Sequence, residues 1–202
     1  MDVGVYNLKY PFRKMIGFLI PFFREISPNR ISWSLVPIGA VTAFLYFFAP
    51  SAPLLYLLGA LFILVRMVVG TMDGLIAVKF QKSSPMGEMI NRIAPEVCDI
   101  LLMLGVVFSA PEYLKIGAIA LAMCWAVTFF GLIGLTAGKK IQSVGPVGQT
   151  DRVVALGIFS ILQLLSSSFG WGLDFIFLFL VWVVIGSFLT LALRVARNFK
   201  VS

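Results

Sequence analysis

Long apolar runs separated by short polar or turn-forming stretches fill most of this chain. Runs of this kind predict membrane-spanning helices, because about 20 apolar residues cross the hydrocarbon core of a bilayer. Six are expected, at residues 31–49, 53–78, 86–110, 112–137, 152–169 and 171–194. The pattern therefore predicts an all-α integral membrane protein with six transmembrane helices in a single domain, residues 1–202.

A different pattern precedes the first predicted span, between residues 10 and 26. Arg13, Lys14 and Arg24 alternate there with methionine, isoleucine, leucine and phenylalanine. This alternation is typical of an amphipathic helix that lies in the membrane interface. A seventh, short span is the alternative, and Pro21 and the flanking charges argue against it.

Composition supports a membrane location and narrows the chemistry. The chain is 60% hydrophobic and 12% charged, with a mean hydropathy of +1.00, whereas soluble domains carry about 25% charged residues. It contains no histidine, and its two cysteines, Cys98 and Cys124, lie in apolar runs. These facts exclude Ser-His-Asp and Cys-His catalysis and histidine-ligated zinc. Acid, base or metal chemistry would have to use carboxylates, amides, hydroxyls or the backbone.

The net charge of +7 is distributed unevenly between the two sets of predicted loops. Thirteen lysines and arginines lie at the termini and in the second-to-third and fourth-to-fifth connections, whereas the opposite connections hold only Lys115. The positive-inside rule then predicts cytoplasmic N- and C-termini, in the inner (cytoplasmic) membrane of a bacterium or archaeon. Such charge also attracts anionic lipid. Because it follows one membrane face without a recognisable motif, nucleic-acid binding is not expected.

Ionisable residues gather inside the second and third predicted spans, although each costs about 2.5–3.5 kcal/mol at the centre of a membrane helix. They are Arg66, Asp73, Glu88, Arg92, Glu96 and Asp99. Helical spacing places those of the third span, with Asn91, on one arc. We expect the two polar faces to meet in a cavity that opens toward the cytoplasm. The alternative is a purely structural cluster of ion pairs, for example Arg66–Asp73 with Arg92–Glu96 or Arg92–Glu88.

The same stretch resembles the signature of the CDP-alcohol phosphotransferases, D-x-x-D-G-x-x-A-R, eight residues, then G-x-x-x-D-x-x-x-D. Asp73-Gly74, Ala77 and Gly87 match it at the right spacing. Two further segments, Ser27–Ser32 before the first span and Gly145–Arg152 before the fifth, are similar to motifs that occur in this family. The resemblance implies a bundle of six spans with an N-terminal interfacial helix.

The resemblance also implies a metal-dependent active site that is incomplete in this chain. Family members are thought to hold Mg²⁺ or Mn²⁺ with aspartates and to use the fourth aspartate as the base. At the signature positions this chain has Gly70, Val78, Asn91 and Pro95 in place of three aspartates and the arginine. Nearby side chains are candidate substitutes: Asp99 and Glu96 as catalytic groups, and Asp73, Asn91 and Glu88 as metal ligands.

Substrate contacts are expected at positions that match the family signature and at basic residues on the predicted cytoplasmic side. The candidates are Gly74, Ala77, Lys79, Gly87, Lys139, Lys140 and Arg152. The basic residues among them could hold the phosphates of a lipid or nucleotide. A simpler interpretation is that they only set the topology, and that Asp151 and Arg152 cap the fifth helix.

Three functions follow from this pattern. The first is a divergent phosphotransferase that moves a substituted phosphate from a CDP-linked lipid or alcohol to an alcohol acceptor, with release of CMP, in phospholipid biosynthesis. The second is an inactive relative that binds membrane lipid or a partner protein through the same cavity. The third and weakest is a small transporter, which the lack of an internal repeat disfavours. The resemblance also implies that the chain can form a homodimer.

Overall fold

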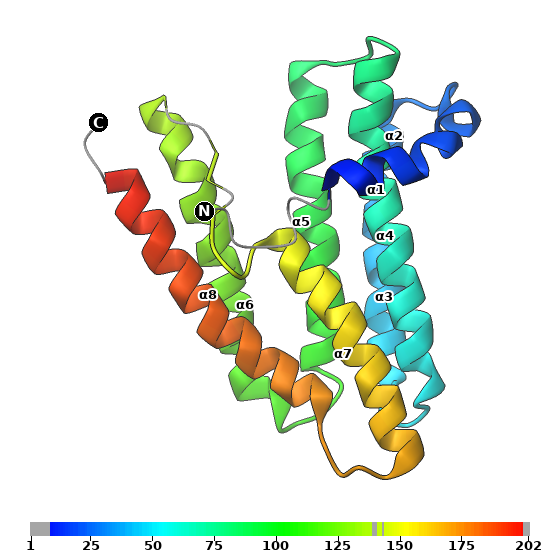
Figure 1. Cartoon of the computed structure of the whole chain (residues 1–202), viewed down its shortest axis with the longest axis vertical. Helices are drawn as coiled ribbons and strands as arrows, with labels where there is room; N and C mark the ends of the chain where they lie inside the picture. Colours follow the sequence, from blue (N-terminus) through cyan, green and yellow to red (C-terminus); the bar gives the residue numbers. More distant parts are fainter. Residues whose placement is uncertain (1–8, 139–140, 143, 200–202) are drawn as a thin grey trace.

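The computed structural model describes residues 9–138, 141–142 and 144–199, and every regular element in this part of the chain is helical (Figure 1). The α-helices are α1 (Lys9–Ile16), α2 (Pro28–Trp33), α3 (Leu35–Phe48), α4 (Leu54–Lys79), α5 (Pro85–Val107), α6 (Tyr113–Leu132), α7 (Gln149–Phe169) and α8 (Phe175–Phe199). Short 3₁₀ helices, Gly17–Phe23 and Ile133–Ala137, follow α1 and α6.

Five of the described helical segments are long and apolar enough to cross a membrane. They are Pro28–Phe48, Leu54–Lys79, Tyr113–Thr136, Gln149–Phe169 and Phe175–Phe199. The expectation of an all-α integral membrane protein is thereby confirmed. Helix α5, with 23 residues, is also long enough. It differs from the other five because Glu88, Arg92, Glu96 and Asp99 lie along it.

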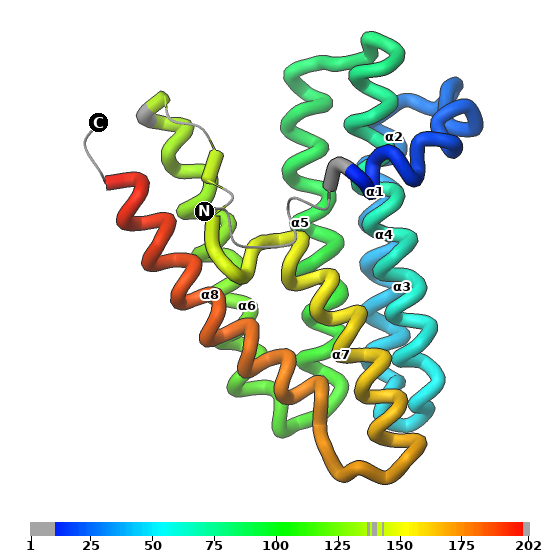
Figure 2. Tube along the Cα trace, viewed as in Figure 1, coloured from blue at the N-terminus to red at the C-terminus, as the bar shows by residue number. Residues whose placement is uncertain are grey.

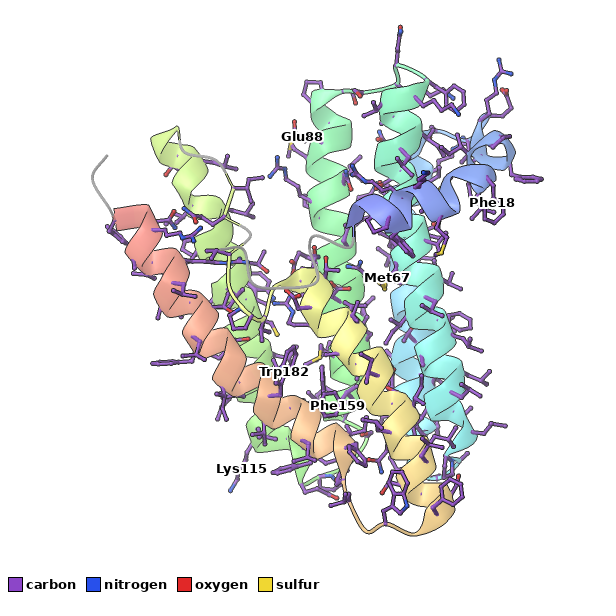
Figure 3. The ribbon with its side chains drawn as sticks, viewed as in Figure 1. Phe18, Met67, Glu88, Lys115, Phe159 and Trp182 are labelled. Atoms are coloured by element: carbon purple, nitrogen blue, oxygen red, sulfur yellow. The ribbon has the colours of Figure 1, made fainter. Side chains whose placement is uncertain are left out.

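The helices form two groups that diverge toward one end of the molecule (Figures 1 and 2). Helices α3, α4 and α5 make up one group, α6 and α8 the other, and α7 packs against both α4 and α8. The end at which the two groups diverge is called the open end. Helix α1, the α4–α5 connection and the C-terminal end of α8 lie there. Lys115 lies at the opposite end from Glu88 (Figure 3). Which side of the membrane the open end faces stays a prediction.

Helix α5 packs most extensively against α3 rather than against α4, its neighbour in the sequence. Two glycines allow this close approach. A Cβ on Gly39 would lie 2.8 Å from the Cα of Cys98, and one on Gly105 would lie 2.3 Å from the carbonyl oxygen of Ala43. Small residues at such crossings let helix backbones come together in membranes. The short α4–α5 connection therefore brings the two helices near each other without making them the main packing partners.

The predicted interfacial helix at residues 10–26 is interrupted. Helix α1 ends at Ile16 and gives way to the 3₁₀ helix that contains Pro21, a residue that cannot continue an α-helical ladder. Ile16 and Ile20 pack into a cluster with Met72 and Ile76 of α4. Phe18, on the opposite side, is exposed (Figure 3). The amphipathic character is thus present, with its buried side on α4.

Several predicted helix ends move by a few residues for local reasons. The first span begins at Pro28, where the Ser27 hydroxyl accepts a hydrogen bond from the Arg30 amide at 3.4 Å. The last begins at Phe175, because Gly170 and Gly172 adopt positive φ angles of 65° and 68°. It then extends beyond residue 194 to Phe199.

The stretch before α7 folds into the interior between the two helix groups (Figure 1). Val144, Gly145, Val147 and Gly148 are buried. The Thr190 hydroxyl of α8 accepts a hydrogen bond from the Val147 amide at 3.0 Å. Gly145 has a φ of 119° and leaves no room for a Cβ beside Thr190. As a result, α7 begins deep within the molecule.

Candidate functional site

A cavity of about 880 Å³ is lined by residues of α4, α5, α6, α7 and α8. Polar side chains of α4 and α5 meet there, and the expected opening toward the cytoplasm stays a prediction. Its ionisable lining residues, within the described chain, are Arg66, Glu88, Arg92, Glu96, Asp151 and Arg194. The remainder of the wall includes amides and hydroxyls from Asn91, Thr128, Gln149 and Thr150 and a long apolar strip along α4 and α7. The cavity is therefore amphipathic.

The apolar part of the cavity reaches the outer surface between α4 and α7. Leu61 and Leu64 of α4 line it from one side, and Ile158 and Ile161 of α7 from the other, and all four are exposed. Exposed aliphatic side chains on membrane-spanning helices face the hydrocarbon of the bilayer. The cavity thus opens sideways into the membrane along this apolar strip. Its other part, lined by the ionisable, amide and hydroxyl side chains named above, is the polar chamber.

Asp73, the surviving signature aspartate, does not line this cavity. Its carboxylate accepts a hydrogen bond from the Ser32 hydroxyl at 2.6 Å and another from the Gly74 amide at 2.5 Å. The residue is 2% exposed. Asp73 thereby joins α4 to α2, and both of its carboxylate oxygens are engaged.

Asp99, one of the two candidate catalytic groups, is held by Arg66 of α4 in a two-point pair. Nε of Arg66 donates to Oδ1 at 2.8 Å, and Nη2 donates to Oδ2 at 2.7 Å. Asp99 is 4% exposed and borders a separate space of about 20 Å³, large enough for roughly one water molecule. Of the ion pairs considered from sequence, Arg66–Asp73 is wrong as a close contact, because Arg66 has Asp99 as its partner.

Glu96 and Glu88 face different partners at the polar end of the cavity. Oε1 of Glu96 accepts a hydrogen bond from the Thr128 hydroxyl at 3.0 Å, and its Oε2 lies 3.8 Å from Nη2 of Arg152. Glu88 pairs with Arg92 one turn along the same helix. The suggested Arg92–Glu88 pair is confirmed, whereas Glu96 approaches Arg152 in place of Arg92.

The beginning of α7 contributes backbone and side-chain groups to the polar chamber. Oδ2 of Asp151 accepts a hydrogen bond from the Gly148 amide at 2.8 Å, so the expectation that Asp151 caps this helix is confirmed. Arg152 does not cap; it is buried and donates to the Cys124 carbonyl at 3.3 Å. Arg152 was counted with the connection before the fifth span, whereas it lies within α7 and is buried; the side of the membrane on which it lies stays a prediction.

Arg194 of α8 is a part of the cavity that the sequence hypotheses missed. It is 6% exposed and donates to the carbonyls of Val144 at 3.0 Å and Val127 at 2.6 Å. Its Nη2 takes part in none of the hydrogen bonds found within the described chain. The sequence did show an arginine at the end of an apolar run. It was counted only as a basic residue under the positive-inside rule and was not considered as a site residue.

The predicted substrate-binding positions are not brought together. Lys79 is exposed at the end of α4, and Gly74, Ala77 and Gly87 are absent from the cavity wall as described. A Cβ on Gly87 would lie 3.0 Å from the Ser84 hydroxyl. Lys139 and Lys140 lie outside the described residues. Of the predicted catalytic and metal positions, Glu88, Asn91 and Glu96 line the cavity.

The described side chains do not fit the divalent cation that the family resemblance implies. Mg²⁺ requires near-octahedral oxygen ligation at about 2.0–2.1 Å, usually with one or two free carboxylates. Within the described part of the chain, no group of three histidine, cysteine or acidic side chains converges. Asp73 is occupied by hydrogen-bond donors, and Asp99 and Glu88 are occupied by arginines.

Comparisons with known proteins agree with the membrane location. No protein-family model matches the chain. The chain is 26% identical over 138 residues to a protein described as inner membrane protein YnbA of Escherichia coli (strain K12), and the match covers 68% of each chain. This similarity and the five apolar helices together identify the chain as an integral membrane protein.

Proposed function

We propose that this protein binds a phospholipid in the cavity between α4 and α7, as a non-catalytic relative of the CDP-alcohol phosphotransferases. In this proposal α5 is the sixth transmembrane helix, and both termini lie in the cytoplasm. The observation that carries the proposal is the single cavity with a polar chamber at one end and an apolar opening between two membrane helices at the other. A phospholipid has the same division along its length.

The size of the cavity supports a large amphiphile. At about 880 Å³ it is near the upper end of ordinary ligand pockets, which span about 300–1,000 Å³. A soluble ligand would leave the apolar strip of Leu61, Leu64, Ile158 and Ile161 uncovered. An acyl chain that enters from the bilayer would cover that strip while its head group remains in the polar chamber.

The charges in the chamber favour a head group with one phosphate over a nucleotide diphosphate. Among the described lining residues, Arg66, Arg92 and Arg194 are balanced by Glu88, Glu96 and Asp151. A pyrophosphate brings at least two negative charges, which the family offsets with a metal ion, and the carboxylates needed to hold that ion are engaged elsewhere. A phosphodiester adds a single negative charge, which one arginine can pair with in the absence of a metal ion.

The proposal is tested by filling the apolar part of the cavity. Gly157 of α7 faces Ile63 of α4, and a Cβ added to it would lie 3.6 Å from Cγ2 of Ile63. The Gly157→Trp variant should lose most of the lipid that the purified wild-type protein retains when palmitoyl-oleoyl-phosphatidylglycerol is added. Native mass spectrometry counts the lipid molecules bound to each protein.

Leu189→Trp provides the matched control, because Leu189 is exposed on α8 and does not belong to the cavity wall described above. This variant should retain lipid as the wild type does. Equal lipid retention by Gly157→Trp and Leu189→Trp would overturn the proposal, provided that both variants unfold at wild-type temperatures.

The phosphotransferase is a second candidate because one observation favours it. Glu96 lies in the cavity wall with its side chain 23% exposed, and its nearest cation, Arg152, is 3.8 Å away. A carboxylate so placed could take a proton from an acceptor hydroxyl. CMP release from CDP-diacylglycerol in Mn²⁺, tested with a panel of alcohols, decides this question. Release that disappears in both Asp73→Asn and Glu96→Gln would establish the enzyme and exclude the non-catalytic proposal.

A further inference from the structure

Arg66 occupies an unusual position in the polar chamber. It belongs to α4 and lies one turn before Gly70, the position at which the resemblance would place the first metal-binding aspartate. A Cβ on Gly70 would have Nη1 of Arg66 as a nearest neighbour, at 3.7 Å. The guanidinium therefore borders the space that a carboxylate and its metal ion would need.

One edge of this guanidinium is fixed and another is available. Asp99 accepts hydrogen bonds from Nε at 2.8 Å and from Nη2 at 2.7 Å. Within the described chain, no oxygen acceptor is found for Nη1, and the Cys98 thiol, a weak hydrogen-bonding group, is a further side-chain partner of the same guanidinium. Arg66 lines the large cavity, whereas Asp99 borders the small space of about 20 Å³ and is not among the lining residues of the large cavity. Asp99 thus holds the guanidinium plane in place without covering its cavity side.

Such an arrangement is suited to binding a phosphate oxygen. Guanidinium N–H groups form short, charge-assisted hydrogen bonds to phosphate, and a guanidinium that is already held in place loses little freedom on binding. Its side chain is 9% exposed, so water competes weakly for the same donors. Gly70 and Arg66 both line the cavity, and Gly70 adds no side chain beside Nη1.

We infer that Arg66, held by Asp99 and uncovered by Gly70, binds the phosphate of the lipid head group in the place of a divalent cation. The inference rests on the proposed lipid-binding function and deepens it. It assigns a phosphodiester as the ligand group and makes its recognition independent of metal. A free phosphate ion presents the same oxygens, so the test must separate the two sources.

Gly70 offers a matched pair of substitutions. Gly70→Asp places a carboxylate beside Arg66 that competes with the phosphate, and Gly70→Asn introduces a side chain of nearly the same size without the charge. The Cβ of either residue has room, because its nearest atoms, on Arg66 and Leu35, would lie at an ordinary contact distance of 3.7 Å. Thermal unfolding in detergent verifies that each variant folds.

The measurement is the affinity of the full-length protein, in EDTA, for palmitoyl-oleoyl-phosphatidylglycerol relative to palmitoyl-oleoyl-glycerol, which lacks the phosphate. The wild type should prefer the phospholipid by about tenfold, as expected for charge-assisted hydrogen bonds. Both variants place a side chain beside Nη1, so both should lower this preference; Gly70→Asn should lower it less than Gly70→Asp, whose added charge should reduce it to about twofold or less. Inorganic phosphate should compete with the phospholipid and leave diacylglycerol binding unchanged.

Several outcomes would overturn the inference. One is an unchanged preference in Gly70→Asp, and another is a preference that disappears in EDTA and returns with Mn²⁺. If Gly157→Trp abolishes lipid binding while Gly70→Asp leaves the preference intact, the proposed function stands and the role of Arg66 falls. If the wild type binds neither lipid but binds inorganic phosphate in a manner that Gly70→Asp abolishes, the phosphate contact stands and the lipid function falls.

Discussion

The two halves of α5 differ sharply, although both belong to one continuous helix. In residues 85–96, Met86, Met89 and Ile93 are exposed and the polar side chains face the cavity. In residues 97–107, most side chains are buried, and Gly105 brings the backbone against α3. The first half forms the wall of a chamber, and the second half is part of the packed core.

Each half contributes a carboxylate to an arginine–carboxylate pair, and the two pairs differ in their expected contribution to stability. Arg92 and Glu88 lie one turn apart in the first half, with side chains 35% and 68% exposed. Arg66 and Asp99 join α4 to the second half, with side chains 9% and 6% exposed. Exposed pairs contribute little to stability, whereas breaking a buried pair leaves an uncompensated charge. An arginine–carboxylate pair is therefore expected to matter more for stability in the second half of α5 than in the first.

The largest effect is expected from Arg66→Ala. Removing the guanidinium leaves the Asp99 carboxylate buried without its partner, which should lower the free energy of unfolding by about 3–5 kcal/mol. Unfolding by SDS in mixed micelles measures the change.

Replacing both partners separates the missing charge from the missing side-chain volume. Arg66→Met combined with Asp99→Leu fills similar space without burying an ion, so it should recover most of the lost stability. A double variant as unstable as Arg66→Ala would show that the ion pair is not the reason for the loss. The second half of α5 would then owe its stability to packing alone.

A smaller loss is expected from Gly105→Ala in the same half. The added methyl group would lie 2.3 Å from the Ala43 carbonyl oxygen, so α3 and α5 must move apart. Overpacking of this kind costs about 1–3 kcal/mol. Gly17→Ala is the control, because no atom lies within 4 Å of its added methyl group. Similar unfolding midpoints for the two variants would contradict the tight packing assigned to the second half.

The apolar pattern predicted the helices well because membrane insertion depends on composition over about 20 residues. It could not predict their neighbours. The pairing of α5 with α3 depends on Gly39 and Gly105, and a glycine within an apolar run does not reveal which helix it will contact. The break at Pro21 and the late start of α8 depend on proline and glycine backbone geometry, which shifts boundaries by only a few residues.

The polar cluster was predicted as a region, but its internal partners were not. Helical spacing placed Glu88, Asn91 and Glu96 toward a common space, and all three line the cavity. The same spacing could not show that Asp99 points behind that space to Arg66. Arg194 was missed because its contact with the site depends on the inward fold of the stretch before α7, where it donates to the Val144 carbonyl. Such long-range contacts leave no periodic signal in the sequence.

The smallest effect is expected from Arg92→Ala in the first half of α5. The Arg92–Glu88 pair is exposed and spans one helical turn, so its loss should change the free energy of unfolding by only about 0.3–0.5 kcal/mol. Salt at 1 M, where the Debye length is about 3 Å, should remove even this difference between the variant and the wild type. Unfolding by SDS at low and high salt measures both values. A loss above about 2 kcal/mol that persists in salt would mean that the first half is as closely packed as the second. The cavity wall would then be rigid core, and a lipid could enter only by displacing it.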